Sequence, residues 1–239
     1  MRKLWALALL LASTALGQIT LSDVSLSDVT VGQAAGGGGC NEFTDDLSSD
    51  PSASWTDDGG WAWDDPNDEY DFAGGGDSSK QLHDTTTTDE NQCALMQVSA
   101  PSLGVVLRGS FTNSDSFYVF EMYYGSWRVN KWTNDSYGDP ARDTQGWSSG
   151  EGGHDDTDDW IALCVDGTST STSFEAWFWD DSSAEAPTGP CPSDWGTANA
   201  STTDCSTWCV DATDQKLVGV MGKGGDASSL TYLAGSDND

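Results

Sequence analysis

Crowded carboxylates are the first groups in this sequence that could do chemistry, because they could bind a metal ion. Of the 39 acidic residues, 32 are Asp and 7 are Glu. The two most crowded runs are Asp155, Asp156, Asp158 and Asp159, and Asp64, Asp65 and Asp68. Ca²⁺ takes six to eight oxygen ligands, which loop carboxylates can supply, although neither run has the spacing of an EF-hand loop. We expect calcium as a candidate cofactor at the 155–159 run, with a solvated acidic loop as the alternative.

Aromatic side chains are the second such group, and the chain contains 12 Trp. An aromatic ring can stack on the apolar face of a sugar, which contributes about 1 kcal/mol per contact. We expect core positions for Trp55, Trp63, Trp160 and at least one of Trp177 and Trp179. The predicted carbohydrate-binding residues flank a central hairpin or lie on loops, and they are Tyr124, Trp127, Trp132, Trp147, Trp195 and Trp208.

Nucleophilic catalysis has one formal motif in the chain. Residues 146–150 read G-W-S-S-G, the pattern of a nucleophile elbow, which needs a preceding strand, a following helix and a late His. The surroundings read as loop, and His154 follows within a few residues, so a Ser/Gly turn is the better interpretation. His83 and His154 are too few for a His-based metal site, and we expect both to be solvated loop residues.

The charge balance excludes one class of partner. The formal net charge is −30, with only 9 Lys and Arg. Such a chain repels nucleic acid and resists compaction through its own repulsion. Two interpretations of the acidity stay open: solvation in a marine or salt-rich environment, and Ca²⁺ binding.

The N-terminal residues have the three parts of a secretory signal. Arg2 and Lys3 precede the apolar run Leu4–Leu11, and small residues end the segment at Gly17. The apolar run is too short to span a bilayer, so we expect a leader at 1–17, no membrane insertion, and a secreted or cell-surface protein. Residues 18–39 contain a short direct repeat and a polyglycine run, which predict a flexible Ser/Gly-rich linker.

Export makes the cysteines candidates for disulfide bonds rather than zinc ligands. Six cysteines allow fifteen connectivities, which the sequence does not resolve. Cys93 and Cys164 lie on expected strands and could link neighbours, in which case Cys40 would pair into an insertion at 182–214. The cysteines of that insertion are Cys191, Cys205 and Cys209.

Short runs of aromatic and β-branched residues, separated by turn residues, organise the rest of the chain. The clearest part is 104–132, with expected strands Val105–Phe111, Phe117–Tyr124 and Trp127–Trp132 and a tight turn at Gly125-Ser126. Further expected strands are 61–63, 68–73, Cys93–Ser99, Trp160–Val165, Ser173–Trp179, Lys216–Met221 and Leu230–Leu233, with a hairpin turn at Asp166-Gly167. Many short strands without a helical stripe predict antiparallel sheets in a sandwich or barrel.

The order of these strands carries a family resemblance. A strand ending in Arg108 precedes a Tyr-rich strand, and then follow a hairpin containing Lys131, a strand with V-D-G at 165–167 and a final V-G strand. This order resembles the concanavalin A-like jelly-roll modules of the laminin-G and pentraxin type, over about residues 41–235. The resemblance implies an all-β, two-sheet antiparallel jelly-roll sandwich, which we place at 40–239 with the Cys-rich insertion inside it.

The resemblance also bears on activity. The glucanase branch of that superfamily uses a Glu-x-Asp-x-x-Glu strand, which places a nucleophile and an acid on one face. No such run occurs here, since Glu69-Tyr-Asp71 is followed by Phe-Ala-Gly. We therefore expect no enzymatic activity. Laminin-G and pentraxin modules often bind Ca²⁺ beside their ligand site, which supports the calcium candidate.

Three functions follow from these observations. The first is a secreted, non-catalytic module that binds carbohydrate or another extracellular ligand. The second is a self-assembling structural subunit of an extracellular assembly or coat, and the third is a polysaccharide hydrolase of the same fold. An open face on the sheet that carries Phe117–Tyr124 would favour binding, and a face covered by the insertion would favour assembly. Asn134-Asp-Ser136 and Asn199-Ala-Ser201 are glycosylation sequons that matter only in a host that uses them.

Overall fold

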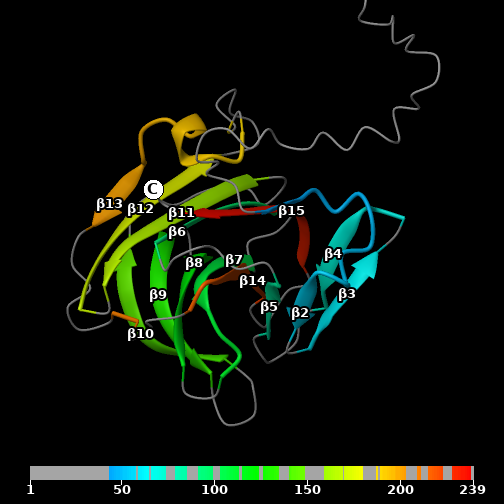
Figure 1. Cartoon of the computed structure of the whole chain (residues 1–239), viewed down its shortest axis with the longest axis horizontal. Coiled ribbons are helices and arrows are strands. Elements are labelled where there is room, and N and C mark those ends of the chain that lie inside the picture. Colours follow the sequence, from blue (N-terminus) through cyan, green and yellow to red (C-terminus); the bar gives the residue numbers. More distant parts are fainter. Residues whose placement is uncertain are drawn as a thin grey trace, which may run out of the picture. The chain divides into compact units, whose positions relative to one another are not determined.

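Fifteen β-strands and one 3₁₀ turn make up the regular elements of the described part of the chain (Figure 1). This computed structural model describes residues 43–57, 59–64, 66–73, 79–84, 91–98, 103–112, 115–123, 126–134, 140–148, 159–168, 170–179, 187, 189–202, 209–210, 215–222 and 228–237, all within the unit Gly39–Asp239. The expected leader and linker lie outside these ranges. No helix in the described residues is long and apolar enough to cross a membrane.

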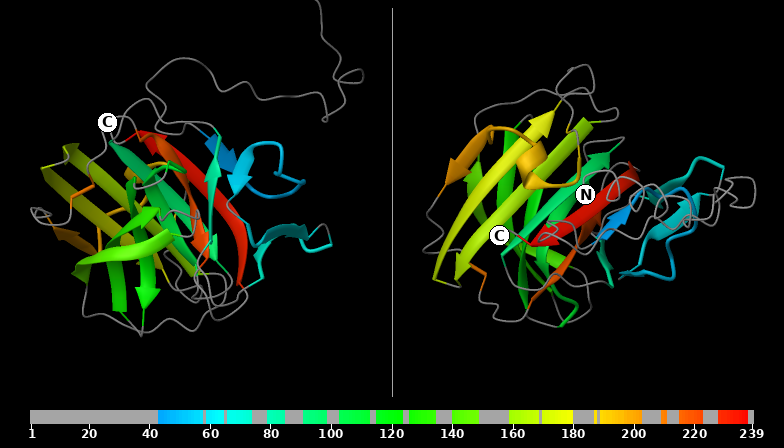
Figure 2. Two further views of the ribbon diagram at one scale, coloured as in Figure 1. Left: turned by 90° about the horizontal axis from the view of Figure 1, so that it is seen from below. Right: turned by 45° about the horizontal axis from the view of Figure 1, so that its top comes forward.

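The strands form two antiparallel sheets, which Figure 2 shows from two further directions. The eight-stranded sheet has the order β13-β12-β11-β6-β15-β4-β3, with β1 paired to β15. Its strands are β1 (Phe43–Asp45), β3 (Trp61–Asp64), β4 (Glu69–Phe72), β6 (Gln92–Val98), β11 (Asp159–Thr168), β12 (Ser171–Trp179), β13 (Ala200–Thr202) and β15 (Ser228–Asp237). The expected two-sheet antiparallel sandwich is confirmed.

The seven-stranded sheet has the order β10-β9-β8-β7-β14-β5-β2. Its strands are β2 (Trp55–Asp57), β5 (Ser79–His83), β7 (Leu103–Gly109), β8 (Ser116–Tyr123), β9 (Ser126–Asn134), β10 (Pro140–Ser148) and β14 (Leu217–Gly222). The meander expected at 104–132 is confirmed as β7, β8 and β9, which pair in succession. Its expected turn at Gly125-Ser126 falls partly outside the described residues.

The core lies between the two sheets, because successive residues of a strand point to opposite faces. Alternate residues of β7 and β8 meet alternate residues of β11 and β12 there. These buried side chains are Val105, Leu107, Tyr118, Phe120, Ile161, Leu163, Val165 and Phe174. Removing such side chains from water at roughly 25 cal/mol per Å² is the main force that holds the two sheets together.

Three local expectations were wrong. Asp166 and Gly167 lie inside the β11–β12 ladder, opposite Ser173 and Thr172, so the hairpin turns after Thr168. Gly167 has φ +111°, which glycine tolerates, and this allows the strand to continue through it. Strand β10 occupies a stretch expected to be loop, because Pro140–Ser148 lacks the alternation that predicts strands. His83 is also not a solvated loop residue.

His83 is buried in β5 instead, among aromatic rings. Its ring stacks on Phe43 with centroids 3.8 Å apart and meets Trp55 edge-on at 5.2 Å. Trp55 in turn stacks on Tyr70 at 6.4 Å. This aromatic group fills one part of the core, as expected for Trp55.

A β-bulge in β7 links the sheets. Two residues of β7, Leu107 and Arg108, lie opposite a single residue of β14. Arg108 has φ +52°, an uncommon value that a bulge accommodates, and its side chain is fully buried. Arg108 Nη2 donates to the Gly167 carbonyl at 2.8 Å, and the guanidinium carbon Cζ lies 5.7 Å from the Tyr118 ring centroid. The Arg singled out in the sequence therefore ties the β11–β12 hairpin to the other sheet.

Candidate functional site

A row of four side chains crosses the outer face of the eight-stranded sheet, and we call it the aromatic row. Trp179 of β12 lies opposite Trp160 of β11, Trp160 opposite Gln97 of β6, and Gln97 opposite Tyr232 of β15. All four residues are partly exposed. Neighbouring strands are about 4.8 Å apart, so the row spans about 14 Å.

Because successive residues of a strand point to opposite faces, the side chains of this row point away from the other sheet. Ile161 and Phe178, the sequence neighbours of Trp160 and Trp179, pack on the inter-sheet core. Trp160, Trp179 and Tyr232 instead pack around a separate cluster on the outer face. The expectation that Trp160 belongs to the core between the sheets is therefore wrong, because its position in β11 has the opposite parity.

The rings of the aromatic row form a corner rather than a flat platform. The Trp160 and Tyr232 centroids are 5.2 Å apart, and their planes meet at 60°. Burial raises the pKa of the Tyr232 hydroxyl, while a hydrogen bond with Thr44 opposes that shift and the charge of Asp46 adds to it. The hydrogen bond with Thr44 connects the Tyr232 hydroxyl to β1.

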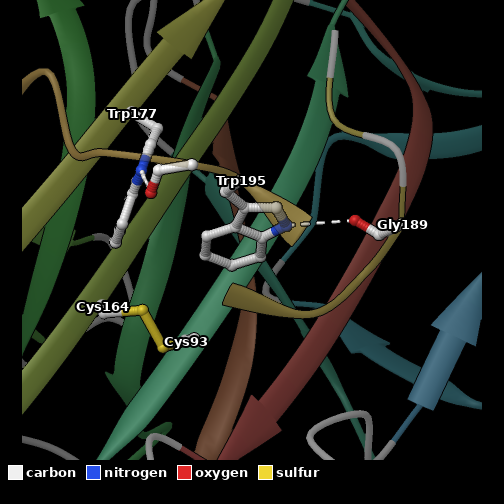
Figure 3. The surroundings of a disulfide bond; sticks show 6 residues. Cys93, Cys164, Trp177, Gly189 and Trp195 are labelled. Atoms are coloured by element: carbon white, nitrogen blue, oxygen red, sulfur yellow. Dashed lines mark hydrogen bonds between the residues drawn. A yellow bond between two sulfur atoms is a disulfide. The ribbon is translucent and has the colours of Figure 1, made fainter. Parts of the chain in front are cut away.

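One side of the row is bounded by residues 189–199 of the insertion, which we call the cap. The 3₁₀ turn η3 (Pro192–Asp194) leads into Trp195, which is buried against Trp177 with centroids 5.2 Å apart at 74°. Trp195 Nε1 donates to the Gly189 carbonyl at 3.1 Å, and Trp177 Nε1 donates to the Gly196 carbonyl at 3.3 Å. Figure 3 shows the Trp195 ring between Trp177 and Gly189. Both buried indole N–H groups therefore have a hydrogen-bond acceptor within the domain, and these bonds hold the cap against the sheet.

A disulfide bond stabilises the strands that carry the row. Cys93 of β6 and Cys164 of β11 lie directly opposite each other and are bonded, which confirms that they link neighbouring strands (Figure 3). Both are buried on the outer face below Trp195. Cys191 and Cys209 are disulfide-bonded as well, and no described cysteine is free. Cys40 and Cys205 lie outside the described residues.

The predicted carbohydrate-binding residues do not form one described cluster. Trp132 and Trp195 are both 4% exposed, and their rings pack on protein. Trp127 and Trp147 belong to β9 and β10, but their side chains are not described, and Tyr124 and Trp208 lie outside the described residues. A binding role for these six stays a prediction. Of the expected core Trp, Trp63 is partly buried against the inter-sheet core. Trp177 and Trp179 both pack in the outer-face cluster, so the expectation that at least one of them belongs to the core between the sheets is wrong.

The calcium prediction falls mostly outside the described residues. Asp159 opens β11, whereas Asp155, Asp156 and Asp158 are not described. In the second run, the Asp64 carboxylate accepts a hydrogen bond from Asn67 at 2.6 Å. No group of three or more His, Cys, Asp or Glu side chains suited to a metal ion occurs within the described ranges.

Most described side chains on the outer face of the seven-stranded sheet, which the sequence singled out, are buried. Its side chains include Leu82, Val106, Phe117, Val119, Trp132 and Met221. Glu121 lies on this face, 2% exposed, and its carboxylate accepts a hydrogen bond from Asn130 Nδ2 at 2.6 Å. The cap lies on the other sheet, so the described cap residues do not cover this face.

Comparison with known proteins bears on the fold. No protein-family model and no curated protein matches the sequence. A Bacillus subtilis protein of unknown function with a galectin-like fold is 10% identical, with a TM-score of 0.54, over 84% of this chain and 97% of that one. The VIP36 lumenal domain with Ca²⁺ and Man3GlcNAc is 9% identical, with a TM-score of 0.47, over 82% and 91%. Basic winged bean lectin with Tn-antigen is 8% identical, with a TM-score of 0.44, over 81% and 96%.

These likenesses concern the fold alone. The galectin-like match has the two-sheet sandwich that the resemblance to concanavalin A-like modules implied, and the fold prediction is confirmed. This domain therefore has a two-sheet antiparallel sandwich of the galectin-like kind. The laminin-G or pentraxin branch stays a prediction.

Proposed function

We propose that this domain is a non-catalytic glycan-binding module whose site is the aromatic row. One observation carries the proposal: Trp179, Trp160 and Tyr232 are brought into register on one face and left partly exposed. Aromatic rings bind the C–H faces of sugars, and exposed apolar clusters of this kind mark binding surfaces.

Polar groups in the same row suit sugar hydroxyls. The Gln97 side chain lies between Trp160 and Tyr232 in the register, and a carboxamide offers both donors and an acceptor. The net charge of −30 opposes polyanionic glycans and favours uncharged ones. A disulfide and a hydrogen-bonded cap hold the surrounding strands, so little ordering entropy is lost on binding.

The location and cofactor remain part of the proposal. The predicted leader at 1–17 and the disulfide bond both favour a secreted or cell-surface protein. Calcium binding at the 155–159 run is part of the proposal, and the array with and without Ca²⁺ tests it. The absence of a Glu-x-Asp-x-x-Glu run supports binding without hydrolysis.

A glycan array with the secreted protein, with and without Ca²⁺, tests this function. Trp160→Ala removes one stacking contact of about 1 kcal/mol, which corresponds to a roughly fivefold higher Kd. Trp208→Ala is the matched comparison, because Trp208 belongs to the other set of predicted binding residues. Absence of binding under both conditions would contradict glycan recognition. Binding lost in Trp208→Ala but unchanged in Trp160→Ala would contradict this site.

A structural subunit is the second candidate, and the same partly exposed rings of the aromatic row favour it, because they could pack against another copy of the chain. The outer face around Phe117 is buried within the domain and offers no open surface for either function. Light scattering over a range of protein concentrations separates the two functions. A monomer at every concentration would argue against assembly.

A further inference from the structure

The sequon Asn199-Ala200-Ser201 lies at the end of the cap, and we propose that Asn199 carries an N-linked glycan. The motif Asn-x-Ser is the acceptor for this modification when x is not Pro. Both Asn199 and Ser201 are exposed in the folded domain. This inference is independent of glycan binding by the aromatic row.

Asn199 is exposed as a residue, and its described side-chain contact involves the amide oxygen rather than the nitrogen. Asn199 Oδ1 accepts a hydrogen bond from the Phe178 backbone N–H at 3.1 Å. That bond occupies the oxygen and leaves Nδ2, the atom that carries the glycan, on the other branch of the amide. No described group accepts a hydrogen bond from Nδ2. A glycan on Nδ2 therefore breaks none of the described contacts.

The surroundings can accommodate a bulky group. Ser201 belongs to β13, which ends the eight-stranded sheet, and lies opposite the exposed Glu175. An edge strand with free backbone groups can pair with another chain, and a bulky, hydrated group beside it hinders such pairing. The glycan would also start next to β12, one residue from Trp179. It would therefore border one end of the aromatic row.

The modification requires a donor that the secretory pathway of a eukaryotic cell supplies, a lipid-linked oligosaccharide diphosphate. Nδ2 forms a bond to the anomeric carbon of the oligosaccharide and loses one proton. The bond between that carbon and the diphosphate oxygen breaks, and the lipid diphosphate leaves with the bonding electrons. No atom is oxidised or reduced. The predicted leader would deliver the chain to the compartment in which this transfer occurs.

The test uses the whole chain with its own N-terminus, secreted from a eukaryotic cell line together with a reporter glycoprotein. Peptide-N-glycosidase in heavy-oxygen water converts each glycosylated Asn to labelled Asp, which peptide mass spectrometry locates. We expect the label at position 199. Asn199→Gln and Ser201→Ala should lose it, while Ser201→Thr should keep it, because Thr is also accepted. A non-reducing peptide map for Cys93–Cys164 verifies folding of each variant.

Two outcomes would overturn the inference. The first is unmodified Asn199 in secreted, folded protein while the reporter is glycosylated in the same cells. The second is a chain that never enters the secretory lumen, because the donor acts only there. Loss of glycan binding in the array leaves the inference intact, since the label at Asn199 is read separately.

Discussion

Removal of the Cys93–Cys164 disulfide should destabilise the domain strongly. The bonded residues are 71 positions apart. Closing a loop of that length in the unfolded chain costs entropy equivalent to about 4 kcal/mol at 25 °C, by the chain-entropy relation. For a domain of this size, each kcal/mol changes the Tm by about 2–4 °C, so the double variant Cys93→Ala/Cys164→Ala should melt roughly 8–16 °C lower. Calorimetry and guanidinium denaturation measure both quantities.

The single variant Cys93→Ala separates the cross-link from packing. It lacks the bond but keeps the Cys164 sulfur, so it should be nearly as unstable as the double variant. Both cysteines are buried, and a small additional loss from packing is expected in the double variant. A loss below about 1 kcal/mol in both variants would refute the reasoning, because a cross-link over this separation could not then restrict the unfolded chain.

Three further predictions concern other contacts. Gly222→Ala would put a Cβ about 2.6 Å from Cδ2 of Phe72 and should lower the free energy of unfolding by about 1–3 kcal/mol. The loss should be smaller in a background with Phe72→Leu, and denaturation of the four proteins of this double-mutant cycle measures the difference. Trp195→Ala should cost about 3 kcal/mol and increase quenching of Trp177 fluorescence by acrylamide; unchanged stability would contradict the packing of the cap. The raised pKa of Tyr232 means that the folded state binds the hydroxyl proton more tightly than the unfolded state does. The resulting contribution to the free energy of unfolding is complete below about pH 10 and is lost as the pH rises through the folded pKa. Tyr232→Phe should therefore flatten the alkaline part of the curve of stability against pH.

The sequence predicted the central strands well because their pattern is local. β6 was expected at Cys93–Ser99 and runs from Gln92 to Val98, since alternating Ala94, Met96 and Val98 define one face. The turn at Asp166-Gly167 was wrong for a tertiary reason. The Gly167 carbonyl accepts a hydrogen bond from buried Arg108 of the other sheet, and its N–H donates to Asn91, so the residue stays within the hairpin ladder.

The candidate site was less accessible to sequence reasoning. Gln97, Trp160, Trp179 and Tyr232 are far apart in the chain, and only the pairing of four strands brings them into one row. The alternation of side chains along β11 shows that Trp160 and Ile161 point to opposite faces of the sheet. It does not show which of the two faces the core, because that depends on where the other sheet packs. Trp195 follows a Pro- and Ser-rich stretch typical of an exposed loop. Its burial depends on Trp177, which no local pattern indicates.

The two outer faces of the sandwich give the strongest argument about function. The outer face of the seven-stranded sheet is aliphatic and aromatic around Val119 and is buried, as expected of a surface covered within the folded domain. On the outer face of the eight-stranded sheet, Trp195 of the cap packs on Trp177, and Trp160 stays partly exposed. A sheet face in water is ordinarily polar, and the described residues leave these rings partly exposed, which supports the proposed binding surface. The ligand proposed above would cover these rings, and a neutral glycan array with Trp160→Ala decides between a sugar and a protein. If no sugar binds, the same exposed rings become the expected contact of an assembly, and Trp160→Ala should then shift light scattering toward the monomer.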